Sequence, residues 1–109
     1  MKPPGTVRNH LWVVLAVHNN GASAILANLT SRRENSDTTC VLMPGMHPYI
    51  KHESCVHYRG MIDRNVDRIP QESRREQASV DMLRLMQQGA INHPFADPEL
   101  VSIIASQIR

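Results

Sequence analysis

An Asn-Gly pair between two apolar runs constrains the fold of this chain more than any other feature of its sequence. Residues 7–17 are rich in Val and Leu, and residues 23–30 resume an apolar pattern after the sequence His-Asn-Asn-Gly at 18–21. Asn-Gly is the strongest short-range signal for a tight hairpin turn, because both central positions of that turn need a positive φ. We therefore predict a β-hairpin, with the odd-numbered residues of 25–29 on one face of its second strand.

Short strand signals continue beyond the hairpin. The expected elements are a polar, solvated loop over 31–38, strands over 39–43, 54–60 and 61–69, and an irregular segment over 46–53. Pro48 argues against a central strand in the irregular segment, since proline cannot donate to a sheet ladder. The charges of 61–69 indicate an edge strand.

The spacing of the apolar residues changes at Pro70 from one typical of strands to one typical of helices. Ser73 and Glu76 fit a capping box, the apolar residues that follow recur at helical spacing, and Gly89 is expected to end this helix. The apolar residues of this first helix are Val80, Met82, Leu83 and Met86.

A second helix is predicted after Asp97, which can cap it, with Pro98 in its first turn. Its apolar stripe consists of Leu100, Val101, Ile104 and Ile108. Five short strands followed by two helices, without βαβ alternation, predict a mainly β fold with α: a small β-barrel followed by two C-terminal helices.

Length and composition place this fold in one domain. A chain of 109 residues suffices for one domain and is too short for two. We expect a single domain over 1–109, with a β-barrel over 6–69 and a helical tail over 70–109. With one Trp, two Tyr and one Phe, the core must consist of aliphatic residues and Met, so dimerisation is expected to add buried area. The net charge of +2 is compatible with nucleic acid as a partner and does not require it.

The cellular compartment follows from the apolar run at 11–17. This run is far too short to span a membrane and is at the short limit for the core of a signal peptide, so we interpret it as a strand. The protein is then expected to be soluble and cytoplasmic, without a membrane partner, and Cys40 and Cys55 are expected to be thiols.

Histidine is unusually dense, with six in the chain and three of them at positions 47, 52 and 57. Histidine changes its charge near neutral pH, so this cluster can supply a general acid and a general base. Ser54, Tyr58 and Arg59 stand close by in the sequence. Cleavage of RNA through its 2′-hydroxyl needs a base, an acid and a cation, and this segment offers all three. The alternative is a solvated loop and strand without a catalytic role.

A second cluster begins at Thr30, which ends a predicted strand before Arg32 and Arg33. A hydroxyl followed by basic residues can hold a phosphate, although a strand-end Thr with solvated arginines explains the same pattern. Arg8 and His10 would face the same site if the barrel places the first strand beside the fourth.

Zinc is the main alternative use of the cysteines and histidines. Cys55 and His57, with His47, His52 or Cys40, could assemble a site, but their spacing matches no standard ligand pattern. We therefore predict two buried structural thiols, no metal and no cofactor.

The order of these pieces resembles the MazF/PemK-like family of toxin endoribonucleases over about residues 8–69. The matching segments are the aromatic and Val/Leu run at 11–14, the Leu-Thr-Ser step at 29–31 and Ser54 followed by a hydrophobic strand. The chain is most similar to a divergent PemK-like branch marked by His-Pro-aromatic-Ile, here at 47–50, and by His-acid-Ser, here at 52–54.

The resemblance implies an SH3-like barrel, a homodimer, metal-independent cleavage of single-stranded RNA as the toxin of a type II toxin-antitoxin system, and a cognate antitoxin protein. It carries the family's catalytic-type threonine over to Thr30. The family's Arg-Pro pair has no counterpart after the first hairpin, and Asn28 replaces a usual proline. Arg8, Arg59 or a histidine would therefore have to replace the catalytic arginine.

These observations give one set of expected site residues. The expected catalytic residues are Thr30, Ser54, His10, His47, His52 and Arg59, and the expected RNA contacts are Arg8, Arg32, Arg33, Lys51 and Tyr58. The alternative function is a non-catalytic SH3-like module that recognises protein or nucleic acid in a phage or plasmid system. That alternative predicts that His10, Thr30 and His47 do not meet in one groove.

Overall fold

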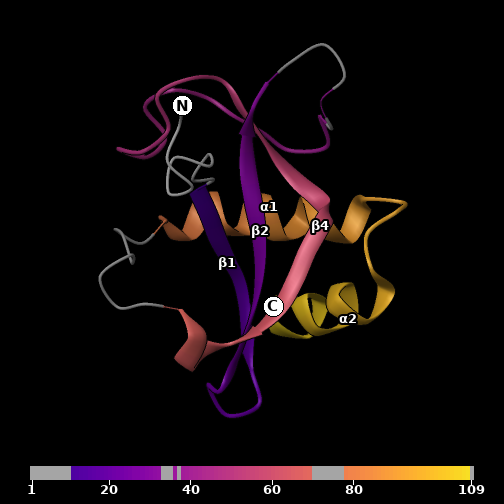
Figure 1. Ribbon diagram of the computed structural model, residues 1–109. Helices are drawn as coiled ribbons and strands as arrows, with labels where there is room; N and C mark the ends of the chain where they lie inside the picture. The colour runs from indigo at the N-terminus through magenta and orange to yellow at the C-terminus, as the bar shows by residue number, and fades with distance from the viewer. Residues whose placement is uncertain (1–10, 33–35, 37, 70–77, 109) are drawn as a thin grey trace, which may run out of the picture.

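In the part of the chain that the structure describes, four antiparallel strands and two α-helices make up a mixed α/β fold (Figure 1). The computed structural model describes residues 11–32, 36, 38–69 and 78–108. The elements are β1 (Leu11–His18), β2 (Ser23–Ser31), β3 (Val41–Leu42), β4 (Ser54–Asn65), the short 3-10 helix η2 (Val66–Arg68), α1 (Val80–Asn92) and α2 (Pro98–Gln107). The described strands form an open sheet in the order β1-β2-β4-β3. Both α-helices lie behind this sheet in Figure 1, so they cover one of its faces.

The predicted hairpin is confirmed, but its turn lies one residue earlier than expected. β1 pairs with β2 up to His18 opposite Ser23. Asn19 and Asn20 have positive φ values of 55° and 57°, and the amide of Gly21 donates to the carbonyl of His18. The two central positions of the tight turn are therefore both asparagines, which tolerate this conformation better than most residues.

β4 replaces the two strands that were expected over 54–60 and 61–69, and it bends where they were expected to separate. Leu26 pairs with Ile62 and Asn28 with His57, so only residue 27 of β2 faces residues 58–61 of β4. Such an irregularity bends a strand strongly.

Gly60 lies in this bend, where a Cβ atom would overlap the His57 ring. The bend therefore needs glycine at this position.

The core lies between the helices and one face of the sheet. As expected, aliphatic residues and Met dominate it, and its fully buried side chains include Leu15, Ile25, Val56, Met86 and Ile104. On β2 the expected alternation is confirmed, because Ile25, Ala27 and Leu29 belong to the core cluster. Burial of each large aliphatic side chain contributes about 1.5–3 kcal/mol.

Tyr58 connects β4 to α1. Its side chain is fully buried, and its hydroxyl donates to the carbonyl of Met86 at 2.6 Å. A Cβ atom at Gly89 would clash with this hydroxyl, so the helix must carry glycine where the ring packs against it. The prediction that Gly89 ends the helix is therefore wrong: α1 continues to Asn92, and Gly89 serves close packing.

The start of α1 also differs from the prediction. Ser79 is the N-cap, and its hydroxyl accepts a hydrogen bond from the amide of Met82. The predicted capping box at 73–76 lies outside the described residues. Met82 and Met86 are buried as expected, whereas Val80, the first residue of the helix, is exposed.

The start of α2 confirms the prediction. The carboxylate of Asp97 accepts hydrogen bonds from the amides of Glu99 and Leu100, and Pro98 occupies the first turn. Leu100 and Ile104 are buried, and Val101 and Ile108 pack against the core at its edge. The expected apolar stripe is therefore the face by which α2 docks.

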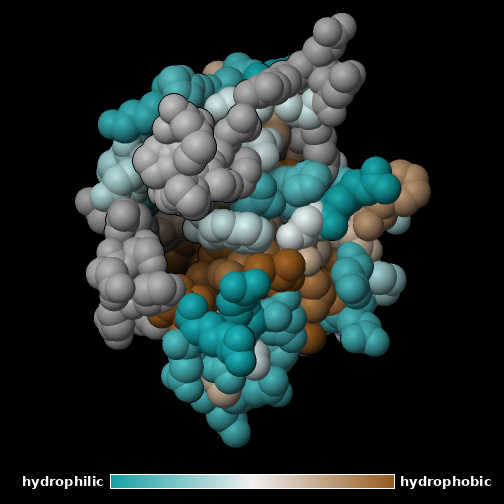
Figure 2. All heavy atoms as spheres, in the orientation of Figure 1, coloured by the Kyte–Doolittle hydropathy of each residue, from teal (hydrophilic) through white to brown (hydrophobic). Residues whose placement is uncertain are grey.

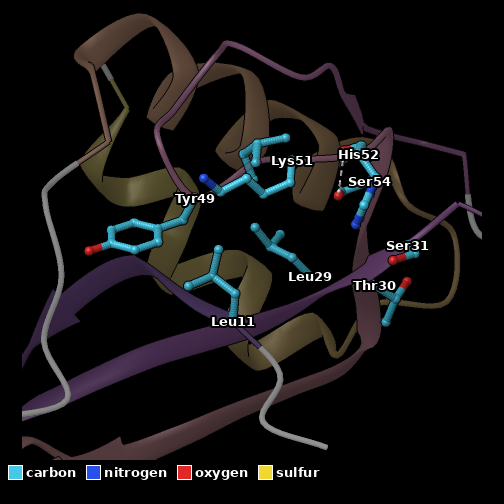
Figure 3. Close-up of a pocket in the computed structure, with 9 residues that line it drawn as sticks. Leu11, Leu29, Thr30, Ser31, Tyr49, Lys51, His52 and Ser54 are labelled. Carbon is cyan, nitrogen blue, oxygen red and sulfur yellow. Dashed lines mark hydrogen bonds between the residues drawn. The ribbon is translucent and has the colours of Figure 1, made fainter.

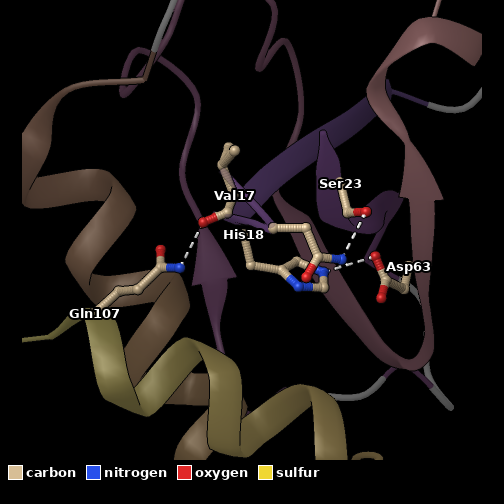
Figure 4. Close-up of polar contacts among 6 residues, drawn as sticks. Val17, His18, Ser23, Asp63 and Gln107 are labelled. Carbon is tan, nitrogen blue, oxygen red and sulfur yellow. Dashed lines mark hydrogen bonds and ion pairs between the residues drawn. The ribbon is translucent and has the colours of Figure 1, made fainter. Parts of the chain in front are cut away.

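Two glutamines attach the helices to the backbone of β1. The register shifts between Val14 and Ala16, so Leu15 forms a bulge. The carbonyl of Leu15 accepts a hydrogen bond of 2.8 Å from the buried Gln87 side chain, and the carbonyl of Val17 accepts one of 2.6 Å from Gln107 (Figure 4). The helices thereby satisfy backbone groups on β1.

His18 forms a further contact at the hairpin end, where its Nε2 atom lies 2.9 Å from a carboxylate oxygen of Asp63 on β4 (Figure 4). The half-buried ring ties the end of β1 to β4.

Cys40 and Cys55 are both buried, and no disulfide is present in the described part of the chain. Cys40 belongs to the main core cluster, whereas Cys55 pairs with Thr30 and does not. Cys55 alternates with the core residue Val56 along β4, so its side chain lies on the other face of the sheet.

Substitution of Gly89 tests the packing of Tyr58. Gly89→Ala is expected to lower the free energy of unfolding by about 1–3 kcal/mol, because the added methyl group overlaps the Tyr58 hydroxyl. At an exposed helix position the same change would stabilise by about 1 kcal/mol. Urea unfolding measures the difference, and stabilisation would contradict the close packing. Adding Tyr58→Phe should recover part of the loss.

Substitution of Gln87 tests the support of the β1 bulge. Gln87→Ala is expected to lower the free energy of unfolding by about 1–3 kcal/mol, because the buried carbonyl of Leu15 loses its partner. Gln88→Ala is the matched control, since Gln88 is the exposed neighbour, and its effect should stay within about 0.5 kcal/mol. Equal effects in thermal unfolding would show that the hydrogen bond to Leu15 is unimportant.

Candidate functional site

A pocket of about 240 Å³ opens where β1 begins, β2 ends and β4 begins (Figure 3). Its lining combines these strand ends with the loop before β4. The lining residues are Leu11, Leu29, Thr30, Ser31, Tyr49, Ile50, Lys51, His52 and Ser54. Four of the residues that the sequence predicted for the site, namely Thr30, Lys51, His52 and Ser54, thus line one pocket.

The two ends of the pocket differ in chemistry. Figure 3 shows Leu11 and Leu29 in its middle, Tyr49 at one end, and Ser31, His52 and Ser54 grouped at the other. Tyr49 is half-exposed, and Lys51 and His52 are exposed, so all three can contact a ligand. The pocket therefore has an aromatic end, an apolar middle and an end rich in hydroxyls with one imidazole.

The register of β2 against β4 separates Thr30 from Ser54. Ser31 pairs with Ser54, and Thr30 pairs with Cys55. Directly opposite residues share a face and neighbours along a strand alternate, so the Thr30 side chain lies on the face of Cys55. Ser31 is therefore the hydroxyl that shares the face of Ser54, and Thr30 contributes to the rim. The Leu-Thr-Ser step was the signal for Ser31, although the prediction took only its threonine.

Local hydrogen bonds shape the loop before β4. The Ser54 hydroxyl donates to the carbonyl of His52 at 2.9 Å. The Nδ1 atom of His47 accepts from the amide of Tyr49 at 3.2 Å, and the two rings lie 5.7 Å apart. His47 does not line the pocket. It instead supports Tyr49, an aromatic lining residue that the sequence prediction missed.

Two of the predicted arginines, Arg32 and Arg59, lie outside the pocket. Arg32 pairs with Glu53 at 2.6 Å, and its amide donates to the Glu53 carbonyl, which joins the end of β2 to the start of β4. The guanidinium of Arg59 lies 5.4 Å from the centre of the Phe95 ring, in the connection between α1 and α2. Of the lysines and arginines in the described part of the chain, only Lys51 lines the pocket.

The burial of Tyr58 contradicts the prediction that this side chain contacts RNA. Its relative exposure is 0%, and its hydroxyl is used by the carbonyl of Met86. The ring belongs to the core because Tyr58 alternates with the exposed residues His57 and Arg59 along β4.

Three predicted residues, Arg8, His10 and Arg33, lie outside the described residues. The expected meeting of His10, Thr30 and His47 in one groove therefore stays a prediction. In the described structure, Thr30 borders the pocket and His47 lies beside it, next to Tyr49.

Among the described residues, no group of three or more His, Cys, Asp or Glu side chains is placed to hold a metal ion. The same part of the chain contains no helix with the length and apolar character needed to cross a membrane. Comparison with protein-family models, with curated proteins and with solved structures finds no match to this chain.

Proposed function

We propose that this protein is a toxin endoribonuclease of the MazF/PemK-like type that cleaves single-stranded RNA without a metal ion. The observation that carries the proposal is the pocket in which Tyr49, Lys51, His52 and Ser54 come together. Its aromatic end suits a base and its basic and hydroxyl-rich part suits a phosphate, as single-stranded RNA requires. The resemblance over residues 8–69 supports the same reading.

The chemistry of the pocket residues fits cleavage through the 2′-hydroxyl. The 2′-oxygen forms a bond to the adjacent phosphorus while the bond from phosphorus to the 5′-oxygen breaks, leaving a cyclic phosphate and a 5′-hydroxyl. A base accepts the 2′ proton and an acid protonates the leaving oxygen. His52 is the imidazole in the pocket for one of these roles, and Lys51 opposes the charge that develops on the phosphate. Lys51 takes the role expected of Arg59.

The bend of β4 supports the proposal that this fold is related to the SH3-like barrel. A strand that bends sharply can pair in two directions, and small barrels depend on such bends to close. In this protein the first part of β4 pairs with β3 and with the end of β2, and the last part pairs with the start of β2.

The resemblance also leads us to propose a cytoplasmic homodimer that a cognate antitoxin neutralises. Several large apolar side chains are exposed, as expected of a protein that buries them in an assembly: Val80, Leu85 and Phe95.

The alternative function is a binding module without catalysis, and one feature of the pocket favours it. Cleavage needs both a base and an acid, whereas His52 is the histidine that lines the pocket in the described structure, and the Ser54 hydroxyl is committed to the carbonyl of His52. Such a module would bind RNA in the pocket and leave it intact.

A cleavage assay distinguishes the two functions. Purified protein is mixed with a long single-stranded RNA in EDTA, and the fragments are separated by electrophoresis. We expect discrete fragments, and a rate about 100-fold lower in His52→Ala because an acid or base is lost. Lys51→Ala should also reduce the rate, since its charge no longer stabilises the transition state.

Arg84→Ala is the matched control for Lys51→Ala. It removes one positive charge from an exposed position of α1 that does not line the pocket, so the rate should not change. Intact RNA with folded protein would overturn the nuclease proposal and leave the binding module. If RNA is cleaved and none of these substitutions lowers the rate, the active site lies outside this pocket.

Glu53→Gln tests whether RNA binds at the rim of the pocket. Glu53 neutralises Arg32 beside the pocket, so its removal should strengthen RNA binding and make binding more dependent on salt. The exposed ion pair contributes at most about 1 kcal/mol to folding, so stability should change little. Fluorescence anisotropy at several salt concentrations gives both quantities. Weaker binding in Glu53→Gln would exclude RNA from this rim.

A further inference from the structure

The face of the sheet opposite the helices carries a row of three side chains that the pocket does not use. Trp12 on β1 pairs with Asn28 on β2, and Asn28 pairs with His57 on β4. The three side chains therefore stand side by side across three strands. Figure 2 views the molecule from this side and shows an apolar band with hydrophilic residues above and below it.

Asn28 is the unusual member of this row. Its relative exposure is 8%, whereas that of Trp12 is 44% and His57 is exposed. Within the described structure, its side-chain amide forms no hydrogen bond. Buried amides nearly always have a partner, so an unpaired one calls for an explanation, and a ligand or a water molecule can complete its hydrogen bonds. An amide between two aromatic rings can receive that partner from a ligand.

The bend of β4 brings Gly60 close to this amide. A Cβ atom at Gly60 would lie 3.3 Å from the Oδ1 atom of Asn28 and would overlap the His57 ring. Glycine thus lets the backbone approach both side chains closely. The same residue that the bend requires also shapes the surroundings of the unpaired amide.

The spacing of the row suits one planar ring. Neighbouring strands lie about 4.8 Å apart, so the backbones at Trp12 and His57 are separated by roughly 10 Å. A planar ring in van der Waals contact on both sides needs about 7 Å, from two contacts of roughly 3.5 Å. Side chains that lean toward each other can supply this gap.

We propose that Trp12, Asn28 and His57 bind one unpaired nucleobase of single-stranded RNA. The base stacks between the two rings, and its polar edge exchanges hydrogen bonds with the Asn28 amide, which offers both donors and an acceptor. The proposal rests on the proposed function for the choice of RNA as ligand. Thr30 lies on the same face two residues from Asn28, so this site adjoins the rim of the pocket.

The fluorescence of Trp12 tests the site directly, because Trp12 is the only tryptophan in the chain. The probes are short oligoadenylate and oligouridylate with 2′-O-methyl groups, which cannot be cleaved through the 2′-hydroxyl. Stacking of a base on Trp12 should quench its emission in a saturable manner with at least one probe. This signal requires no catalytic activity.

Substitutions in this row measure how much each side chain contributes to RNA affinity. Asn28→Leu keeps a similar volume but removes the hydrogen bonds, so the affinity should fall about tenfold. Its melting temperature should rise, because an unpaired buried amide is replaced by an apolar group. His57→Ala should weaken binding by a similar factor, and His57→Phe should restore it because the stacking ring returns.

The controls separate this site from the pocket. Arg84→Ala should leave the quenching unchanged, and a cleavage assay on unmodified RNA runs in parallel. Saturable quenching that Asn28→Leu weakens supports the site even if no RNA is cleaved, an outcome that would overturn only the nuclease. Cleavage without quenching, or quenching with unchanged affinity in Asn28→Leu, would overturn the site and leave the nuclease proposal standing.

Discussion

The contact between Tyr58 and α1 holds the rest of this structure together. The ring reaches from the bend of β4 into the core, its hydroxyl bonds to the Met86 carbonyl, and Gly89 leaves room for it. Because this contact joins the sheet to the first helix, it determines which face of β4 is buried. His57 and Arg59 on either side of Tyr58 must then face outward.

Orientation of β4 in turn divides the polar residues of the sheet between two surfaces. Ser54 and its partner Ser31 lie at the pocket, at the open end of the core face. Thr30, Asn28 and His57 lie on the opposite face, which the helices do not cover. An RNA strand that contacts both surfaces has to cross the end of β2, where Thr30 stands at the rim. The two proposed sites therefore describe consecutive parts of one path for the ligand.

Predictions from the sequence succeeded where the determinants are local. Asp97 and Pro98 mark the start of α2 because a cap depends on neighbouring residues alone. They failed where a distant residue decides. Gly89 looked like a helix stop, yet it lies inside α1 because Tyr58, 31 positions earlier in the chain, requires its missing side chain. For the candidate site, Lys51, His52 and Ser54 could be found from the sequence, whereas Tyr49 was missed. The Leu-Thr-Ser step pointed to Ser31 as well as Thr30, but only the register of β2 against β4 shows that Ser31 shares the face of Ser54.

By itself, the sequence determined the hairpin, the two helical periods, the aliphatic and Met core and the cluster of polar residues before β4, since each follows from residue type and short-range spacing. Only the tertiary structure decided that Tyr58 is core, that Arg59 lies over Phe95, and that Thr30 and Ser54 lie on different faces. These outcomes depend on the register of β2 against β4 and on the bend of β4. A shift of one residue in that register would exchange the two faces, and no local pattern specifies it.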